Sequence, residues 1–470
     1  MTRLFLHVLA LCLLFIAGPA TAGASGVAYR ETTLPNGLRV IVARGPSDPQ
    51  VTARLMVKSG AWADPPGLAG TAVMAAGMLT DGTSRRDAQA IARDVAALDA
   101  KLAGSGGLEA SVVTLQVRPG DLEPALLIMA EVIRHPAYRP EALDARRKWT
   151  FEGLAAAYGE PGGLGYQVGA PVIFAGTPLG HAAEGTAASL PRLQAAGLAE
   201  FHAKHYRPDN AVLVLAGDIA PEQAFALAAQ AFGTWTSPPG PPPKAPAITP
   251  RAPPWRGVVD LPGVSTASVR VIARAVSRDD PRYYMALVAN AGLGGEGSGR
   301  LSRAAAGRAE LGEGASSVFS ARRTTGYLSA NLAPQSVAVP EALELICVEM
   351  SGLSANPVAQ DELAARKGEL IAGYSRQLLT TRGLAAVIGD LALFDLPLGE
   401  IDALPAGIEA VTAKQVQAFA KQVLDPAGAN IIIVGDAQAF APALTLQTPA
   451  MQVLGRGDLD LDAPDLRAAR

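Results

Sequence analysis

Two stretches of this sequence repeat one pattern: FHAKHYRPDNAVLVLAGD at residues 201–218 and FAKQVLDPAGANIIIVGD at residues 419–436. Each is typical of an amphipathic helix that runs through a proline-containing turn into a buried aliphatic strand and a final Gly-Asp. Four residues of the first stretch recur 218 positions later in the second: Phe201, Pro208, Gly217 and Asp218 as Phe419, Pro426, Gly435 and Asp436. This spacing favours an internal duplication, so we expect two homologous domains.

A proline-rich segment separates the two copies. TSPPGPPPKAP at 236–246 continues into TPRAPPW, and proline at this density favours extended chain over helix or sheet. We therefore predict an N-terminal domain at 28–235, a linker at 236–256, a C-terminal domain at 257–440 and a tail at 441–470. The last part of the tail, GRGDLDLDAPDLRAAR, is acidic and then basic, and we expect it to be poorly ordered.

The pattern of the first half predicts an α+β domain. YRETTLPNGLRVIVAR contains Asn36-Gly37, a turn typical of antiparallel hairpins, before an apolar alternating run. Further strands are indicated by VTARLMVKSGAWAD and at 109–119, and helices at 67–80, 86–103, 121–134 and 140–158. Because strands and helices do not alternate strictly, we expect each half to be an antiparallel sheet with helices on one face.

The composition and the N-terminal sequence limit the classes of protein to which this chain can belong. Hydrophobic residues make up 49% of the 470, which allows a large core, and the net charge of -3 excludes the basic footprint of a nucleic-acid-binding protein. Arg3, the apolar run LFLHVLALCLLFIAG and ATA at 20–22 are typical of a signal peptide at 1–22 that is cleaved near Ala22. That run is shorter than the roughly 20 residues that span a bilayer, although a membrane anchor is the alternative. We expect a periplasmic protein with no later membrane span and, with Cys347 as its one remaining cysteine, no internal disulfide.

The order of several segments resembles the pitrilysin/insulinase (M16) family of zinc peptidases. The resemblance is carried by LPNGLRV, SGAWADPPGLAG, FHAKHYRPDNAVLVLAGD, FGTW and, in the second half, GLGGEGSGRLS, and it covers about 28–440. It implies two homologous α+β domains arranged as a clamshell, the LuxS/MPP-like metallohydrolase fold.

The residues that carry catalysis in active members of this family are replaced here. Active members have His-x-x-Glu-His after Gly-Leu-Ala, so that two histidines on one helix face bind Zn²⁺ and the glutamate takes a proton from the metal-bound water. The matching positions are Gly70, Val73 and Met74. Glycine and valine offer no donor atom, and a thioether is a poor Zn²⁺ ligand among oxygen and nitrogen donors. The third ligand of active members, a later glutamate, corresponds to Glu152, which is either a remnant of the site or a solvent-facing carboxylate.

The second half departs from the family pattern as well. Active members place an arginine and a tyrosine after the segment that matches RLS at 300–302, where they reach the substrate backbone. These positions fall on Ala306 and Glu313 here, and a shift of two residues would supply Arg308 but no tyrosine. We therefore expect no catalytic residue, metal or cofactor in this chain, with zinc only in a catalytic partner.

Two further features could bind ligands. NAGLGGEGSGRL at 290–301 resembles the glycine-rich loop that non-catalytic subunits of the family use in handling extended peptides, although a plain helix–loop connection is the alternative. Its five glycines are Gly292, Gly294, Gly295, Gly297 and Gly299. His202 and His205 are spaced like a metal-ligand pair, but no cysteine or carboxylate cluster accompanies them, so we interpret both as structural.

Three functions are consistent with these observations. The first is an inactive subunit that pairs with an active M16 subunit carrying His-x-x-Glu-His and helps to hold extended peptides in a shared chamber. The second is a structural or binding subunit without a proteolytic partner, comparable to the core subunits that this fold supplies to respiratory complexes. The third, a metallopeptidase that uses unrecognised ligands, is the least compatible with the missing donor atoms.

Overall fold

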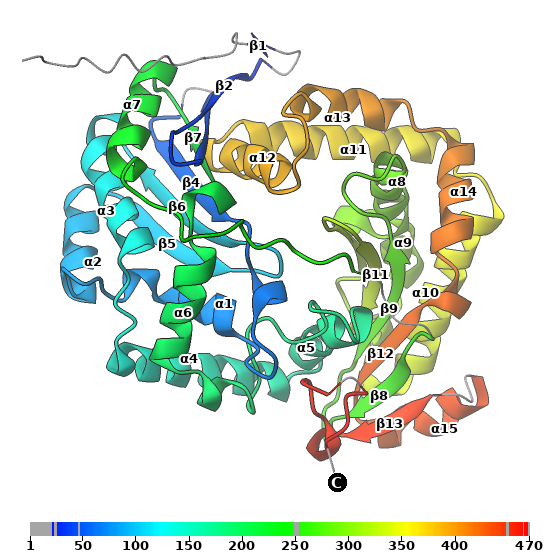
Figure 1. Ribbon diagram of the computed structural model, residues 1–470. Coiled ribbons are helices and arrows are strands. Elements are labelled where there is room, and N and C mark those ends of the chain that lie inside the picture. The colour runs from blue at the N-terminus through cyan, green and yellow to red at the C-terminus, as the bar shows by residue number, and fades with distance from the viewer. Residues whose placement is uncertain are drawn as a thin grey trace, which may run out of the picture.

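The computed structural model describes residues 21–22, 26–45, 48–248, 253–447, 451–463 and 465–468. The expected signal peptide lies outside these residues except for its last two positions. Two β-sheets, each with its own helices, form the two halves of the molecule (Figure 1).

The first sheet has the strand order β1-β2-β3-β7-β4-β6-β5. The hairpin predicted at Asn36-Gly37 joins β2 and β3 as an antiparallel pair. The strands are β1 (Thr21–Ala22), β2 (Ala28–Thr33), β3 (Arg39–Arg44), β4 (Val51–Val57), β5 (Lys101–Gly106), β6 (Ser111–Val117) and β7 (Ala211–Ala216). Helices cover one face of this sheet around a core that includes Leu55, Leu115 and Phe232. They are α1 (Thr71–Gly77), α2 (Ala88–Ala97), α3 (Leu122–Arg134), α4 (Pro140–Gly159), α6 (Ala195–His205) and α7 (Pro221–Phe232).

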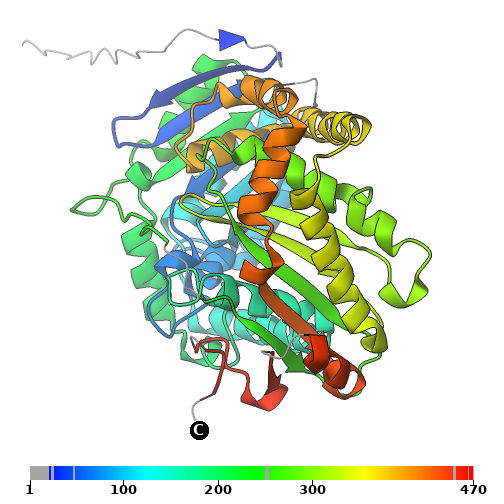
Figure 2. The same ribbon diagram turned by 90° about the vertical axis from the view of Figure 1, so that its right-hand side faces the viewer.

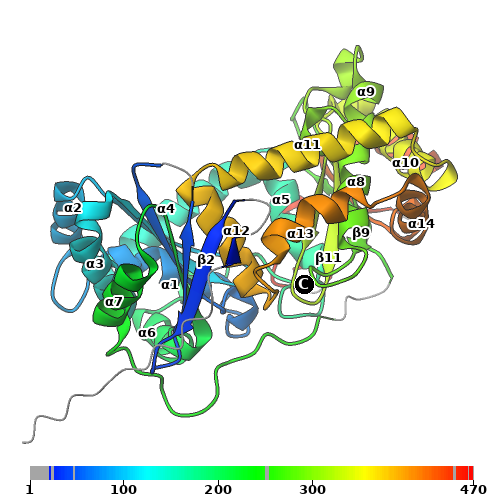
Figure 3. The ribbon, with the colours of Figure 1, turned by 90° about the horizontal axis from the view of Figure 1, so that it is seen from above.

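The second sheet has the order β10-β11-β9-β12-β8-β13. Its strands are β8 (Arg256–Asp260), β9 (Ser268–Ala275), β10 (Ser316–Ala321), β11 (Gly326–Leu332), β12 (Asn430–Gly435) and β13 (Gln452–Gly455). The helices that follow β9 are α8 (Tyr283–Leu293), α9 (Arg300–Ala305), α10 (Val339–Ala355), α11 (Gln360–Leu378), α13 (Glu400–Glu409), α14 (Ala413–Val423) and α15 (Ala437–Gln447). Seen from above, α11 extends from the second half toward the first (Figure 3).

The repeated stretches occupy equivalent places in the two sheets, as the duplication predicts. The first forms the end of α6 and strand β7, and the second forms the end of α14 and strand β12. Each strand has one parallel and one antiparallel neighbour, β3 and β4 for β7, β8 and β9 for β12. Both sheets are therefore mixed, whereas the sequence predicted antiparallel sheets. The sequence pattern did not distinguish a mixed sheet from an antiparallel one, because the inner strands β7 and β12 are buried on both faces.

Each half also lends one helix to the other, so helices cover both faces of each sheet rather than one. Helix α12 (Thr381–Leu393) of the second half packs Leu384 and Ile388 against Ile41 and Met56 of the first sheet. Helix α5 (Pro161–Ile173) of the first half packs against the second sheet through an apolar cluster that includes Leu164. Figure 1 shows α12 and α5 on opposite sides of the junction between the halves. This reciprocal exchange joins the halves through two apolar interfaces.

The C-terminal segment is ordered where the structure describes it, so the expectation of a poorly ordered tail was wrong. Strand β13 adds to the edge of the second sheet, pairing in parallel with β8 through Leu454 and Val259. Beyond it Leu461 and Leu466 are buried, and the Asp462 carboxylate accepts a hydrogen bond from the Thr186 hydroxyl of the first half at 2.7 Å. Figure 2 shows this segment in red at one end of the molecule. The sequence of the tail did not reveal this structure, because its pairing partner β8 lies about 200 residues away in the sequence.

The proline-rich segment connects the halves without helix or strand over its described part, residues 236–248. It is held to the first half by Arg207, which donates to the Gly240 carbonyl at 2.6 Å. Of the helices that the structure describes, none combines the length and the apolar character that a membrane span requires.

Candidate functional site

The short helix α1 carries the positions that match the metal-binding motif. It spans only Thr71–Gly77, and Gly70 is its N-cap residue, with φ of 95° in the left-handed region. The Asp64 carboxylate caps the helix by accepting hydrogen bonds from the backbone N–H groups of Gly70 at 2.9 Å and Ala72 at 2.8 Å. Burial raises the pKa of Asp64 to about 7, against the opposing effect of the nearby His181 and these hydrogen bonds. A carboxylate from outside the motif thus occupies the helix N-terminus.

The backbone at Gly70 leaves little room for a side chain, because even a Cβ would be in tight contact with the neighbouring loop. A Cβ at this position would lie 3.0 Å from the Cα of Gly185 and 3.1 Å from the carbonyl oxygen of Glu184. The positive φ adds strain for any residue other than glycine. A histidine at position 70 would therefore require the segment around 184–185 to move.

The other two motif positions pack rather than point into a site. Met74 is 3% exposed within the apolar core of the first half. Val73 lies against the edge strand β5, where a Cβ on Gly106 would come within 2.6 Å of the Val73 Cα. The zinc that the family implies does not fit these residues, because none supplies a donor atom directed at a shared point.

Glu152 stands apart from these positions on α4. Its side chain is exposed and makes no hydrogen bond or ion pair with the described residues. It therefore has the surroundings of a solvent-facing carboxylate. No group of three or more His, Cys, Asp or Glu side chains arranged to hold a metal occurs in the described part of the chain.

The histidines bond to protein groups instead of converging on one point. His202 donates from Nε2 to the Ile133 carbonyl at 2.7 Å, and His205 Nδ1 lies 3.0 Å from the Ser59 hydroxyl. Burial lowers the pKa of each histidine to about 4. Both are thus neutral structural residues at ordinary pH, as we interpreted them from the sequence.

The glycine-rich segment connects α8 to α9 and packs closely against β10. A Cβ on Gly294 would lie 2.5 Å from the Ser317 backbone nitrogen, and a Cβ on Gly299 would lie 2.5 Å from the Gly294 Cα. These two glycines are required by packing. Gly297 has φ of 76° and faces open space, whereas Gly292 and Gly295 would have only ordinary van der Waals contacts with a Cβ. The turn and the close approach explain three of the five glycines and leave two available for other roles.

Polar contacts with the long helix α11 fix this segment. Ser298 donates to the Glu369 carboxylate at 3.2 Å and accepts a hydrogen bond from Arg366, while Arg303 donates to the Ser298 carbonyl at 2.8 Å. Arg300 and Glu362 form an ion pair at 2.9 Å beside them. Because α11 leads directly into α12, the glycine-rich segment is connected through one pair of helices to the first half.

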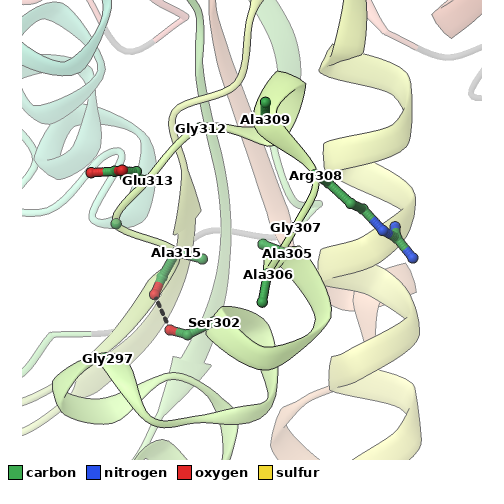
Figure 4. A pocket seen from close by; sticks show the side chains of 11 residues that line it. Gly297, Ser302, Ala305, Ala306, Gly307, Arg308, Ala309, Gly312, Glu313 and Ala315 are labelled. Atoms are coloured by element: carbon green, nitrogen blue, oxygen red, sulfur yellow. Dashed lines mark hydrogen bonds between the residues drawn. The ribbon is translucent and has the colours of Figure 1, made fainter.

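A cavity of about 550 Å³ opens beside the glycine-rich segment (Figure 4). Its wall is formed by residues 305–309 and 312–315 together with Gly297 and Ser302. The positions that match the substrate-binding arginine and tyrosine of active members, Ala306 and Glu313, both line it. The sequence indicated only that two side chains were missing; that a pocket lies there depends on the path of the loop, which no motif signals.

Comparisons with known proteins agree with this fold. Two family models match the chain: insulinase (peptidase family M16) over residues 39–161 and peptidase M16 inactive domain over residues 192–370. A protein of Streptomyces coelicolor described as a zinc protease is 26% identical over 405 residues, covering 84% of this chain and 87% of its own length. Subunit 1 of the mitochondrial cytochrome b-c1 complex of Caenorhabditis elegans is 27% identical over 194 residues, 41% of each chain.

Two solved structures share the fold over nearly their whole length. The peptidase M16 inactive domain from Pseudomonas fluorescens has a TM-score of 0.80 and 26% identity, covering 87% of this chain and 98% of that one. A protease from Helicobacter pylori also has a TM-score of 0.80, at 16% identity, and covers 87% of this chain and 99% of its own. The second likeness concerns the fold alone.

Proposed function

Because the chain belongs to the M16 peptidase family, we propose that it is an exported, catalytically inactive subunit that pairs with an active M16 zinc peptidase. The partner would supply His-x-x-Glu-His, the zinc ion and the general base. This chain would supply two of the domains that enclose the substrate chamber and would help to hold extended peptides. The expected signal peptide supports a periplasmic location for this complex.

One observation supports the proposal above the others. Gly70, the position of the first histidine in active members, is the left-handed N-cap of α1, and a Cβ there would be in tight contact with Gly185. A site that had lost only its ligands would keep a cavity where the ligands stood. Here Met74 is part of the core, and Asp64 is committed to the backbone of the helix. The fold is retained while the residues at the motif positions are packed against their neighbours, which supports a subunit that encloses the substrate chamber without catalysing the reaction.

Co-expression with an M16 protein that carries His-x-x-Glu-His tests the proposal. We expect the two chains to purify as a stable complex with peptidase activity that disappears when the partner loses its histidines. Glu152→Gln in this chain should leave that activity unchanged, since Glu152 is exposed and unpaired. Peptide hydrolysis by this chain alone, or failure to bind any such partner, would contradict the proposal.

The likeness to subunit 1 of the cytochrome b-c1 complex favours a second candidate, a structural or binding subunit with no proteolytic partner. Such a subunit would assemble with other proteins but would not bind extended peptides. The genes that surround this one separate the candidates: an adjacent gene for the same fold with His-x-x-Glu-His intact supports the first, and genes for a membrane complex support the second.

A further inference from the structure

A second cavity, of about 90 Å³, lies where the two halves meet. Helix α5 of the first half lines one side of it, and strands β9 and β11 of the second sheet line another (Figure 1). Its volume is that of about three water molecules, which suits a small group such as a carboxylate rather than a ligand that fills about 300–1,000 Å³. Tyr166 of its wall is 68% exposed, so the cavity can be reached from solvent beside this side chain.

Arg270 reaches the cavity from the inner strand β9. Its guanidinium donates to the Gly165 carbonyl at 2.6 Å and to the Asn331 side-chain oxygen at 3.2 Å, and both partners are uncharged. No carboxylate of the described residues lies within ion-pair distance of it. Burial lowers the pKa of Arg270, which reflects the cost of keeping a charge away from water. Because a guanidinium stays protonated in proteins, Arg270 is a desolvated cation without a counter-ion in the described part of the chain.

Arg322 lies at the same wall, and its charge is only loosely balanced. Its Nη1 atom is 4.0 Å from the Glu109 carboxylate, beyond hydrogen-bond distance, and its buried Nε has no hydrogen-bond partner among the described residues. Glu184, the carboxylate that lines the cavity, is exposed and accepts a hydrogen bond from the Gln167 amide at 3.1 Å. The wall therefore carries two arginines and one glutamate, and the glutamate is bonded to a neutral group.

Two phenol groups complete the polar lining. Tyr166 and Tyr327 both line the cavity, and neither hydroxyl forms a hydrogen bond with the residues that the structure describes. Each hydroxyl can donate one hydrogen bond to an anion that the guanidinium groups attract. The cavity thus combines positive charge with free hydrogen-bond donors, which is the chemistry that recognises a carboxylate.

From this arrangement we propose that the cavity at the junction binds a carboxylate group of an extended peptide, paired with Arg270 and Arg322. The inference rests on the proposed function, since it names the chemical group by which such a subunit would hold a peptide. The carboxylate can be the C-terminus of the peptide or an acidic side chain, because both present the same two oxygens. Arg274 lies on the same face of β9, its side chain makes no hydrogen bond or ion pair with the described residues, and it would attract acidic groups to this region.

Peptide binding to the full mature chain tests this inference. Three peptides of glycine, serine and alanine carry the same uncharged fluorophore: one ends in a free carboxylate, one in a carboxamide, and the third is amidated with one central glutamate. We expect fluorescence anisotropy to show at least one acidic peptide binding about tenfold more tightly than the neutral one, as a hydrogen bond to a charged group allows. A preference for the first peptide identifies the chain end as the ligand, and a preference for the third identifies the side chain. Equal affinities, or no binding of any peptide, would overturn the inference and leave the proposed function to the co-expression experiment.

Two variants and a matched control make the test specific. Arg270→Gln and Arg322→Gln should each bring the affinities of the three peptides close together. Arg322→Gln should fold normally, because the Arg322 side chain makes no hydrogen bond with the described residues. The control Arg274→Gln removes the same charge from strand β9 outside the cavity wall and should keep most of the preference. A preference that survives both cavity variants, or that Arg274→Gln reduces as much as they do, would overturn the inference.

Discussion

Gly70 and Gly185 face each other so closely that a Cβ on Gly70 would lie 3.0 Å from the Gly185 Cα. The contact lies at the position that matches the first histidine of the motif in active M16 peptidases. It joins the N-terminus of α1 to the loop before α6. A metal ligand is therefore disfavoured at this position by the backbone geometry at Gly70 as well as by the lack of a donor side chain. Reintroducing the residues of the motif would therefore not be enough to restore a metal site, because the backbone around Gly70 would also have to change.

We expect that Gly70→His combined with Met74→His will not create a zinc site and will destabilise the protein. A side chain at Gly70 meets backbone atoms at a positive φ, which should cost about 2 kcal/mol or more in the free energy of unfolding. Chemical denaturation of Gly70→Ala measures this cost. Gly176→Ala is the control, because Gly176 has φ of 74° and open space around it, so it reports the cost of φ alone. Equal losses in the two alanine variants would show that the contact with Gly185 imposes no constraint.

The exchanged helices predict that the two halves unfold together. Leu384 is fully buried against the first sheet although it belongs to the second half, so Leu384→Ala should lower the free energy of unfolding by about 2–5 kcal/mol. The exposed Leu379 nearby serves as the control, with an expected change of less than about 0.5 kcal/mol. Differential scanning calorimetry should show one transition that shifts as a whole. Two separate transitions would contradict the account of reciprocal packing.

The buried His202 should lower the free energy of unfolding in mild acid, because the unfolded chain takes up a proton more readily than the folded chain does. Its pKa is about 4 in the folded chain, below the ordinary value of 6.5, so between these values the unfolded chain binds the extra proton. The contribution of His202 to stability should fall by up to about 3 kcal/mol as pH drops from 6.5 to 4. Gln can still donate to the Ile133 carbonyl but does not titrate, so His202→Gln should change the slope of the curve of stability against pH by this amount, while His205, whose pKa burial also lowers to about 4, keeps its own contribution. Parallel curves for the variant and the native chain would show that His202 does not contribute.

Asp64 should have the opposite effect on the dependence of stability on pH. Burial raises its pKa in the folded chain to about 7, above the ordinary value of 3.8, so the folded chain binds the extra proton between these values. This contribution favours folding at low pH and is lost as pH rises from about 4 to 7. Asp64→Asn removes the titration and half of the cap, and should cost about 1 kcal/mol at low pH and less near neutral pH. A cost that grows with pH would mean that Asp64 is ionised in the folded protein throughout this range.

Some glycines of the glycine-rich segment should be required for folding, and others should tolerate substitution. Gly294→Ala should destabilise the protein, because its Cβ would lie 2.5 Å from the Ser317 nitrogen. Gly295→Leu should fold normally, since its nearest neighbours lie at 3.6 Å, and should weaken peptide binding if this segment handles peptides. Thermal unfolding, together with the fluorescence anisotropy of a labelled unstructured peptide, distinguishes the two effects. Unchanged peptide affinity in Gly295→Leu would remove the segment from the proposed function.

The duplication could be predicted because the residues that repeat have the same structural role in both halves. Phe201 and Phe419 each anchor a helix in a core, Gly217 follows the inner strand β7, and Gly435 is the last residue of the inner strand β12. The exchange of α5 and α12 was missed, although Gly163-Leu164 and Gly383-Leu384 repeat at a spacing of 220 residues. An apolar helix shows that it is buried, but its sequence does not show which sheet it covers.

The residue types at 70, 73 and 74 predict that the metal ligands of the motif are missing, but they do not predict the geometry around them. The approach of Gly70 to Gly185 depends on a contact between segments that are distant along the chain. The Asp64 cap is a local contact, six residues from Gly70, but no motif signals it. Strand β13 pairs with a strand that is distant along the chain, and the cavity beside the glycine-rich segment depends on the path of its loop.

The most direct test of the account is the zinc content and peptidase activity of the mature chain purified alone, measured by mass spectrometry of bound metals and by cleavage of an unstructured peptide. We expect far less than one zinc per chain and no cleavage, with cleavage restored only by a partner that carries His-x-x-Glu-His. One zinc per chain together with cleavage that Glu152→Gln abolishes would contradict the account.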